Sequence, residues 1–252
     1  MNTTELASSI SADQRAAFAR DGVIVIRNLL SPDEVARFRA ALLARSAPDR
    51  AAYCRHDVFT QVVDTWRDDP VLRELALHSK LIAVARGLCD GAVRLWHDQI
   101  LTKAPGNGAP THYHQDQPYW PVPPTARSFA FWLALGDTPE AHGCMSFLPG
   151  SQRLRELPAQ DLNDAGSLLG LCPDLAYAEA RTIPLRAGDV TVHDGMTAHR
   201  AGANQLDRPR VAHSVIYLEA DVCYRAQAHV VTDPLGLTPG QPLPDDRFPR
   251  FE

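Results

Sequence analysis

The sequence has few lysines, no long apolar run and few cysteines, and each shortage excludes a class of protein. Only two of its 252 residues are lysine, and 30 acidic residues against 25 basic ones give a formal net charge of −5. A nucleic-acid binder needs a basic surface to displace counterions from phosphates, so we expect no nucleic-acid partner. No apolar run approaches the roughly 20 residues that span a bilayer, so we expect no membrane helix.

The N-terminus and the cysteines indicate the compartment. The first 14 residues are polar and acidic, and they lack the positive start and apolar stretch of a secretory signal. The five cysteines are odd in number and scattered without a CxxC pair, which is typical of reduced thiols in core positions rather than of a disulfide framework. We therefore expect a cytoplasmic protein.

Composition and continuity favour one globular domain. With 45% hydrophobic and 22% charged residues, the chain is close to the average of soluble domains. No repeat or low-complexity linker interrupts it, so we predict a single domain over residues 1–252. Within it, we expect a mainly helical part over 1–90, a β-rich core over 91–232 and an irregular, proline-rich tail over 233–252.

Helix signals gather in the first third of the chain. Ser11 and Ser31 precede helical patterns as N-caps, Ser31 with Glu34 at the third helical position, and Gly22 ends the first pattern before a β-branched stretch. These patterns predict a strand over Val23–Ile26 and helices over Asp13–Arg20, Pro32 to about Arg45, Val71–Leu77 and Leu81–Leu88.

After Gly91 the pattern changes to short apolar or alternating runs separated by turn residues. Such spacing is typical of a β-sandwich or barrel, here with helices packed against it. Residues 152–180 are an insertion of mixed character. The expected strands are Val93–Lys103, Ser128–Leu135, Cys144–Leu148, Thr182–Leu185, Asp189–His193 and Arg210–Leu218.

The strongest chemical pattern begins at Thr111-His-Tyr-His-Gln-Asp116. Residues two apart in an extended segment project to one face, so His114 and Asp116 can reach one metal ion together. His199, shortly after a strand, can complete a two-histidine, one-carboxylate triad, which leaves coordination positions of non-haem Fe(II) open. An open metal site indicates catalysis.

Other histidines compete for these roles. His112 shares a face with His114 and is the main rival ligand, and we expect it near the site without binding metal. His193 is interpreted as a structural hydrogen-bonding residue in the turn before His199. The remaining candidates are interpreted as solvent-facing or packing residues, namely His142, His213 and His229.

An arginine follows the third ligand at the start of an apolar strand. The guanidinium of Arg210 is planar and permanently charged, which suits bidentate capture of a carboxylate. Arg210 is therefore a candidate anchor for a dicarboxylate cosubstrate beside the metal.

Taken in order, these motifs resemble the phytanoyl-CoA dioxygenase family of Fe(II)/2-oxoglutarate oxygenases. The resemblance rests on His114-Gln-Asp116 with Tyr119-Trp120 after it, Gly143–Ser151, Gly188-Asp189, and His199 with Asn204 and Arg210. It covers nearly the whole chain. It implies a mainly β fold with flanking α-helices, whose core is a double-stranded β-helix of the jelly-roll, cupin-like type.

The resemblance also implies roles. His114, Asp116 and His199 match the iron ligands, and Arg210 matches the arginine that binds the far carboxylate of 2-oxoglutarate. Trp132 falls where the family has a tryptophan lining the cosubstrate site, although a buried core aromatic fits equally, and Gln99 is a candidate hydrogen-bond donor to the cosubstrate. Candidate substrate contacts are His97 and Lys103, which share a strand face with Gln99, together with His112, Tyr119 and Trp120.

The implied cofactors are Fe(II), 2-oxoglutarate and O2, acting on a small-molecule substrate, with secondary metabolism as the expected setting. Asp116 occupies the position that is small in related halogenating oxygenases, which favours hydroxylation of an unactivated C–H bond over chlorination. Epimerisation or desaturation at the same iron site remains an alternative. A non-oxygenase, metal-dependent enzyme of the cupin type is the other alternative, and Arg210 argues against it.

Overall fold

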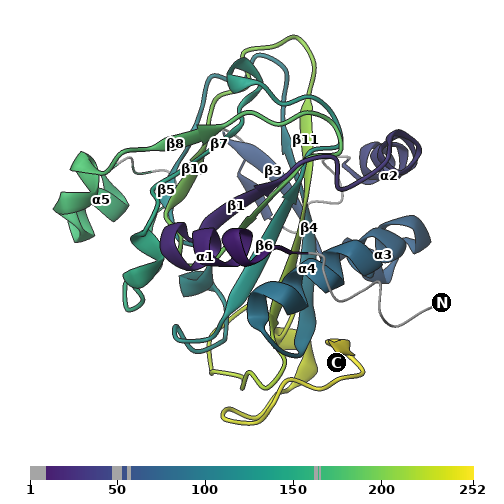
Figure 1. The fold of residues 1–252 in the computed structure, drawn as a ribbon, viewed down its shortest axis with the longest axis vertical. Helices are drawn as coiled ribbons and strands as arrows, with labels where there is room; N and C mark the ends of the chain where they lie inside the picture. The colour runs from purple at the N-terminus through teal and green to yellow at the C-terminus, as the bar shows by residue number, and fades with distance from the viewer. Residues whose placement is uncertain (1–9, 47–52, 56–57, 162–163, 165) are drawn as a thin grey trace.

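Two antiparallel sheets, with helices over the larger one, make up most of the structure (Figure 1). The computed structural model describes residues 10–46, 53–55, 58–161, 164 and 166–252. The α-helices are α1 (Ala12–Asp21), α2 (Pro32–Arg45), α3 (Pro70–Ala76), α4 (Ser79–Cys89) and α5 (Ser167–Leu171). Short 3-10 turns are η3 (Thr65–Arg67), η4 (Gln117–Tyr119), η5 (Glu140–His142), η6 (Ser151–Arg153), η7 (Pro173–Tyr177) and η8 (Asp233–Leu235).

The helix starts follow the capping signals of the sequence. The Ser11 hydroxyl accepts a hydrogen bond from the backbone N–H of Gln14, and Ser31 does the same for Glu34, each within a reciprocal capping box. Gly22 ends α1 with a φ of 73°, and a side chain there would also approach Thr197 Oγ1 to 2.3 Å. Glycine is therefore required at this turn into the next strand.

The large sheet has eight strands in the order β1-β9-β6-β11-β4-β3-β2, with β12 paired to β4, and the small sheet has the order β5-β10-β7-β8. The strands of the large sheet are β1 (Val23–Ile26), β2 (Tyr53–Arg55), β3 (Phe59–Val63), β4 (Val93–Lys103), β6 (Ser128–Leu133), β9 (Val190–His193), β11 (Arg210–Glu219) and β12 (Arg250–Phe251). Those of the small sheet are β5 (Thr111–His114), β7 (Met145–Phe147), β8 (Arg181–Ile183) and β10 (His199–Ala201). Every pairing is antiparallel, so the predicted mainly β fold with helices is confirmed.

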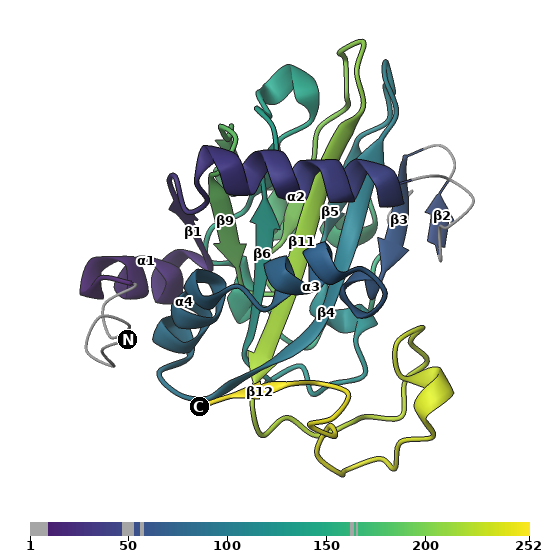
Figure 2. The same ribbon diagram turned by 90° about the vertical axis from the view of Figure 1, so that its right-hand side faces the viewer.

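The two faces of the large sheet pack against different partners. Helices α2, α3 and α4 lie across one face (Figure 2), where Phe131 and Tyr217 join an apolar cluster with helix residues such as Leu72. Successive side chains of a strand point to opposite faces, so Trp132 belongs instead to a cluster with Phe147 of the small sheet. The space between the sheets is thus where β4, β5, β6, β10 and β11 present their inward side chains.

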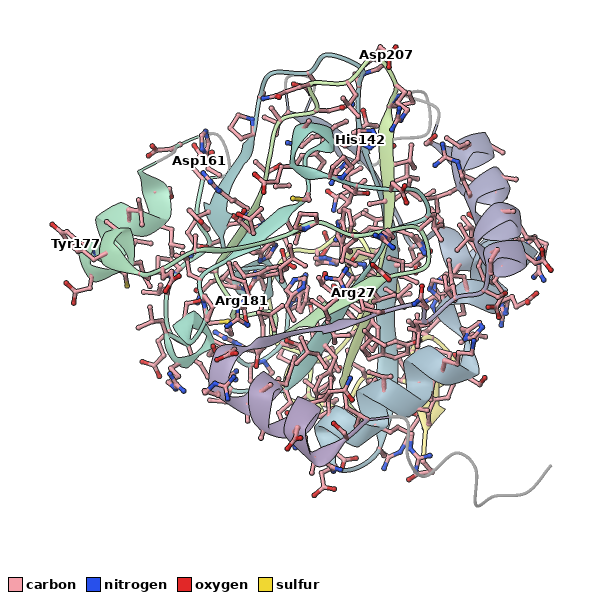
Figure 3. All side chains as sticks on the ribbon, turned by 45° about the horizontal axis from the view of Figure 1, so that its top comes forward. Arg27, His142, Asp161, Tyr177, Arg181 and Asp207 are labelled. Atoms are coloured by element: carbon pink, nitrogen blue, oxygen red, sulfur yellow. The ribbon has the colours of Figure 1, made fainter. Side chains whose placement is uncertain are left out.

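Some elements escaped the sequence pattern. The four main predicted helices and six predicted strands of the core are present, with ends that shift by a few residues. Missed were β2 and β3, in a stretch interpreted as mainly helical, and β12, in the tail predicted to be irregular. The three-residue strand β10, which is too short to show alternation, was missed as well, and β5 was expected only as an extended segment. The insertion over 152–180 carries η6, α5 and η7, and Tyr177 projects from it with 91% of its surface exposed (Figure 3).

The expectations on compartment are tested only in part. Cys89 and Cys144 are buried free thiols, and Cys172 and Cys223 are free and half-buried. Among the described residues, every helix is too short or too polar to cross a membrane. The first nine residues, on which the lack of a secretory signal was argued, and the side chain of Cys54 lie outside the described residues.

Candidate metal centre

Strand pairing brings the three predicted ligands together. His114 is the last residue of β5 and His199 the first of β10, and the two are direct partners in the register, with ring centroids 4.3 Å apart. Asp116 follows β5 by two residues, and its Oδ1 lies 3.4 Å from His114 Nε2 and 3.6 Å from His199 Nε2. One ligand atom from each residue lies within 4.8 Å of the others, a spacing that one metal ion can bridge.

Backbone carbonyls fix both imidazoles. His114 Nδ1 donates to the carbonyl of His112 at 2.8 Å, and His199 Nδ1 donates to that of Thr197 at 2.9 Å. A carbonyl only accepts, so Nδ1 of each ring carries a proton and Nε2 is the atom that faces Asp116. Such second contacts are typical of histidines that ligate metals.

The ionisation states also suit a metal. Burial lowers the pKa of His199 to about 3, so its imidazole is neutral near pH 7. Burial alone would raise the pKa of Asp116, but the facing His199, His114 and His193 hold it well below its usual range. Neutral imidazole and ionised carboxylate are the forms that bind metal ions.

A third histidine contacts the same carboxylate. His193, the last residue of β9, places Nε2 3.4 Å from Asp116 Oδ2, and its ring centroid lies 4.6 Å from that of His199. The ring holds the carboxylate oxygen that faces away from His114 and His199. This placement fits the structural, hydrogen-bonding role predicted for His193.

A cavity of about 410 Å³ opens beside these residues, between the two sheets. Arg210, at the start of β11, lines it with only 3% of its surface exposed, and its guanidinium carbon lies 5.5 Å from the centroid of the Trp132 ring. Arg210 Nε and Nη1 and Trp132 Nε1 are buried donors that find no acceptor among the described residues. Burial lowers the pKa of Arg210 to about 10, which leaves the group charged at neutral pH.

Buried donors rarely go unsatisfied, and an unpaired buried cation is costly. A carboxylate or another anionic acceptor that entered the cavity would satisfy these donors and pair with the charge. The cavity therefore has the chemistry of a site for a metal ion and an anionic ligand side by side.

The comparisons with known proteins agree with this geometry. Residues 18–212 match the phytanoyl-CoA dioxygenase (PhyH) family. This chain belongs to that family. The matched range contains the whole candidate triad and Arg210.

The proteins that this chain is similar to differ in their reactions. The ectoine dioxygenase of Sphingopyxis alaskensis is 28% identical over 92% of this chain and 81% of its own. The structure of the non-haem, alpha-ketoglutarate-dependent carbocyclase SnoK from nogalamycin biosynthesis is 32% identical, with a TM-score of 0.85 over 98% of both chains. The epimerase SnoN, solved with Fe3+, alpha-ketoglutarate and nogalamycin RO, is 31% identical, with a TM-score of 0.81 over 99% of both chains.

Most of the residues that the family resemblance suggested for the pocket do line the cavity. From β4, His97 and Gln99 face it, and the Gln99 side-chain oxygen accepts a hydrogen bond from Gln61 of β3. Tyr119 and Trp120 form part of the wall, and the Tyr119 hydroxyl donates to the carbonyl of Gln160.

Two of the suggested residues are not among the described residues that line the cavity, namely His112 and Lys103. The backbone carbonyl of His112 accepts the hydrogen bond from His114 Nδ1 described above. The Lys103 ammonium donates to the carbonyls of Ala109 at 2.9 Å and Gly202 at 2.8 Å. Burial, and next the neighbouring Arg210, lower the pKa of Lys103 to about 7. Lys103 therefore ties together the backbone around β5 and β10.

Sequence reasoning missed one whole wall of the cavity. His229, interpreted as a packing or solvent residue, lines the cavity with Gln227 and Val230, and β3 adds Phe59 and Gln61. His229 does pack, 5.1 Å from the ring centroid of Trp96, but it also faces the cavity. The segment around it is irregular, so no periodic pattern indicated its direction.

Proposed function

We propose that this chain is an Fe(II)/2-oxoglutarate-dependent dioxygenase that hydroxylates an unactivated C–H bond of a small molecule in secondary metabolism. The observation that carries the proposal is Arg210, a buried cation with unpaired donors in the same cavity as the triad. A metal-dependent hydrolase or isomerase has no use for a dicarboxylate anchor at this position. The double-stranded β-helix is part of the proposal, supported by the chain's repeated crossing between the two sheets from β4 to β11.

The residues fit the cofactors that the family uses. His114, Asp116 and His199 would hold Fe(II), and Arg210 would pair with the far carboxylate of 2-oxoglutarate, with the Trp132 N–H as a further donor. When bound, the iron and its cosubstrate supply the activation of O2 for attack on a C–H bond. The protein's share is to position these groups and to keep water from the cavity.

The residues divide this work. The carbonyls of His112 and Thr197 hold the two ligand imidazoles in one tautomer, and His193 holds the second oxygen of Asp116. Arg210 orients the cosubstrate from the far end, so that its other end meets the triad. The walls around His97 and Trp120 are left to position the substrate.

Asp116 bears on the reaction type. A carboxylate stands where halogenating relatives have a small residue, so chloride has no vacant position beside the iron. Hydroxylation is the proposal's first choice. Epimerisation or ring closure, which begin with the same attack on a C–H bond, is a second candidate because SnoN and SnoK are 31% and 32% identical to this chain. Desaturation belongs to the same group of outcomes.

Three measurements test the proposal. Fe(II) and 2-oxoglutarate, added together without air, should give a visible absorption band that neither gives alone, and a substrate screen should release succinate in air. An alcohol product formed under ¹⁸O₂ should carry label even with chloride present. A chlorinated product would overturn the argument from Asp116, and an unlabelled epimer or alkene would replace hydroxylation by the second candidate.

A further inference from the structure

One buried imidazole that lines the cavity has a nitrogen acceptor with no hydrogen-bond donor facing it among the described residues. His97 is 2% exposed, and its Nδ1 lies 3.3 Å from the carbonyl oxygen of Asp98. A carbonyl only accepts, so Nδ1 carries the proton and donates. Burial lowers the pKa of His97, which keeps the ring neutral. In a neutral ring, Nε2 is then an acceptor, and it has no donor among the described residues.

Beside it lies an imidazole of the opposite polarity. The ring centroids of His97 and His229 are 5.4 Å apart, and both residues line the cavity. His229 Nδ1 accepts a hydrogen bond from the backbone N–H of Val231 at 3.2 Å. Burial, and next the neighbouring His97, lower the pKa of His229 to about 3, so this ring is also neutral. Its proton therefore lies on Nε2, which is a donor.

A hydroxyl group fits this pair because it donates one hydrogen bond and accepts others. A ketone or an ether offers no proton and would leave His97 Nε2 unsatisfied. An ammonium or a carboxylate would enter a region without a fixed countercharge, since Asp116 and Arg210 are the only formally charged side chains among the described residues that line the cavity. In the proposed function, Asp116 pairs with the metal and Arg210 pairs with the cosubstrate.

The surroundings of the pair are aromatic. The Trp120 ring stands edge-on to His97 with centroids 6.2 Å apart, and Tyr119 lines the same wall. His97 also lies on a different strand from His193, a histidine that contacts Asp116. In the register, His97 pairs with Ile216 of β11, Ile216 pairs with Ala130 of β6, and Ala130 pairs with His193 of β9. The backbones of His97 and His193 are therefore three strand spacings apart across the sheet, about 14 Å.

We propose that His97 and His229 bind a hydroxyl group of an uncharged aromatic substrate in this cavity. The inference rests on the proposed function, since it assigns the substrate of that same cavity. His97 is a specificity residue here. Its acceptor favours a ring that carries a hydroxyl group over the same ring with an ether or a ketone in that place.

Two fluorescent probes that differ in that proton test the inference. The full-length protein, loaded with zinc and 2-oxoglutarate so that no turnover occurs, is titrated with 7-hydroxycoumarin and with 7-methoxycoumarin at mildly acid pH. Binding is followed by fluorescence anisotropy. We expect the hydroxyl probe to bind at least about tenfold more tightly, because the ether leaves a buried acceptor unpaired.

His97→Asn supplies the matched variant. An asparagine amide can still donate to the Asp98 carbonyl, but the shorter side chain places no acceptor at the position of His97 Nε2. The preference for the hydroxyl probe should shrink to within about twofold, and His229→Asn should reduce it less. His142→Asn is the control, because His142, in η5 (Figure 3), is another buried imidazole with Nδ1 on a carbonyl and Nε2 unpaired. It is not among the described residues that line the cavity.

Equal binding of the two probes by the wild-type protein would overturn the inference, as would a preference that survives in His97→Asn or failure of both probes to bind at about 1 mM. The binding of 2-oxoglutarate by the same preparation is measured separately. If it depends on Arg210 while the probes show no preference, the hydroxyl site alone is wrong. If it does not depend on Arg210, the proposed function fails first.

Discussion

The two ends of the cavity offer a ligand different chemistry. At one end Arg210 offers a buried positive charge with unpaired donors, fixed on a long central strand and backed by Trp132. At the other end His97 and His229 are neutral and offer one acceptor and one donor among aromatic rings. The first end suits an anionic ligand, and the second suits an uncharged, hydroxylated ligand.

This difference explains how one scaffold can serve several reactions. In the proposed function, charge would hold a small dicarboxylate in one place whatever the substrate is, because the pairing depends only on the carboxylate. The neutral end can change its selectivity with a few side chains while the metal and Arg210 stay in place. The carbocyclase, the epimerase and the ectoine dioxygenase that this chain is similar to illustrate such a range of outcomes.

The largest expected effect lies between the two ends. His114→Ala, Asp116→Ala or His199→Ala should each lower turnover by at least about 1,000-fold, because each removes one of three protein ligands and leaves both ends without a reacting centre. Titration with Co(II), which reports metal binding directly, is the companion measurement. His112→Ala keeps its backbone carbonyl and should still bind metal. If it lost the metal while His114→Ala did not, the ligand assignment would be wrong.

The second-largest effect is expected when only the charged end is removed. Arg210→Ala should raise the 2-oxoglutarate concentration needed for half-maximal activity by at least about tenfold, since a buried carboxylate would lose a charge-assisted contact worth about 2–5 kcal/mol. Binding of metal and of 7-hydroxycoumarin should change little. Arg208→Ala removes an exposed arginine two residues away and serves as the control. An unchanged requirement in Arg210→Ala would falsify the anchoring role.

The triad and the charged end were far easier to predict from the sequence than the neutral end. His114, Asp116, His199 and Arg210 sit on or beside strands, where spacing and alternation tell which side chains share a face. The same reasoning brought His97 and Gln99 to the cavity wall. It failed for Lys103, on the same strand face, because carbonyls of a neighbouring loop capture its ammonium, and a strand pattern carries no information about loops.

The neutral end depends on segments without periodicity. His229 belongs to an irregular stretch after β11, and β3 adds its side chains through a pairing with β4 that the sequence did not indicate. The orientation of the His97 imidazole depends on a single backbone carbonyl, that of Asp98. Long-range pairing and individual hydrogen bonds decide such sites, so the sequence predicts the strands of the fold better than the part that faces the substrate.

A pH titration of stability separates the ends by their buried imidazoles. The pKa of His229 is about 3 in the folded protein, below the ordinary value of 6.5, so the unfolded chain takes up a proton first as the pH falls. Stability is therefore lost between about pH 6.5 and pH 3. In urea unfolding of the metal-free protein, His229→Asn should lose about 2 kcal/mol less than the wild type between pH 7 and pH 5. Burial lowers the pKa of His199 in the same way, so part of the pH dependence of stability should persist in that variant.

Equal slopes in the two proteins would mean that folding does not lower the pKa of His229. Below about pH 6.5 the donor at Nε2 would then belong to a cation, and the neutral character of this end would be lost there. The comparison between the ends depends on that outcome.

The smallest expected effect concerns His193, which shares its cross-strand row with His97. His193→Leu removes the contact to Asp116 Oδ2 and frees that oxygen, so the carboxylate no longer offers Oδ1 alone to the metal. We expect affinity for Co(II) to fall about tenfold, the lower range for loss of a second-shell partner. His193→Gln, whose amide can donate from a position near that of Nε2, should recover most of the affinity. Both variants should keep the preference for 7-hydroxycoumarin, since the neutral end is intact. If His193→Leu changed that preference as much as the metal affinity, the row would act as one unit and the two ends would not be separable.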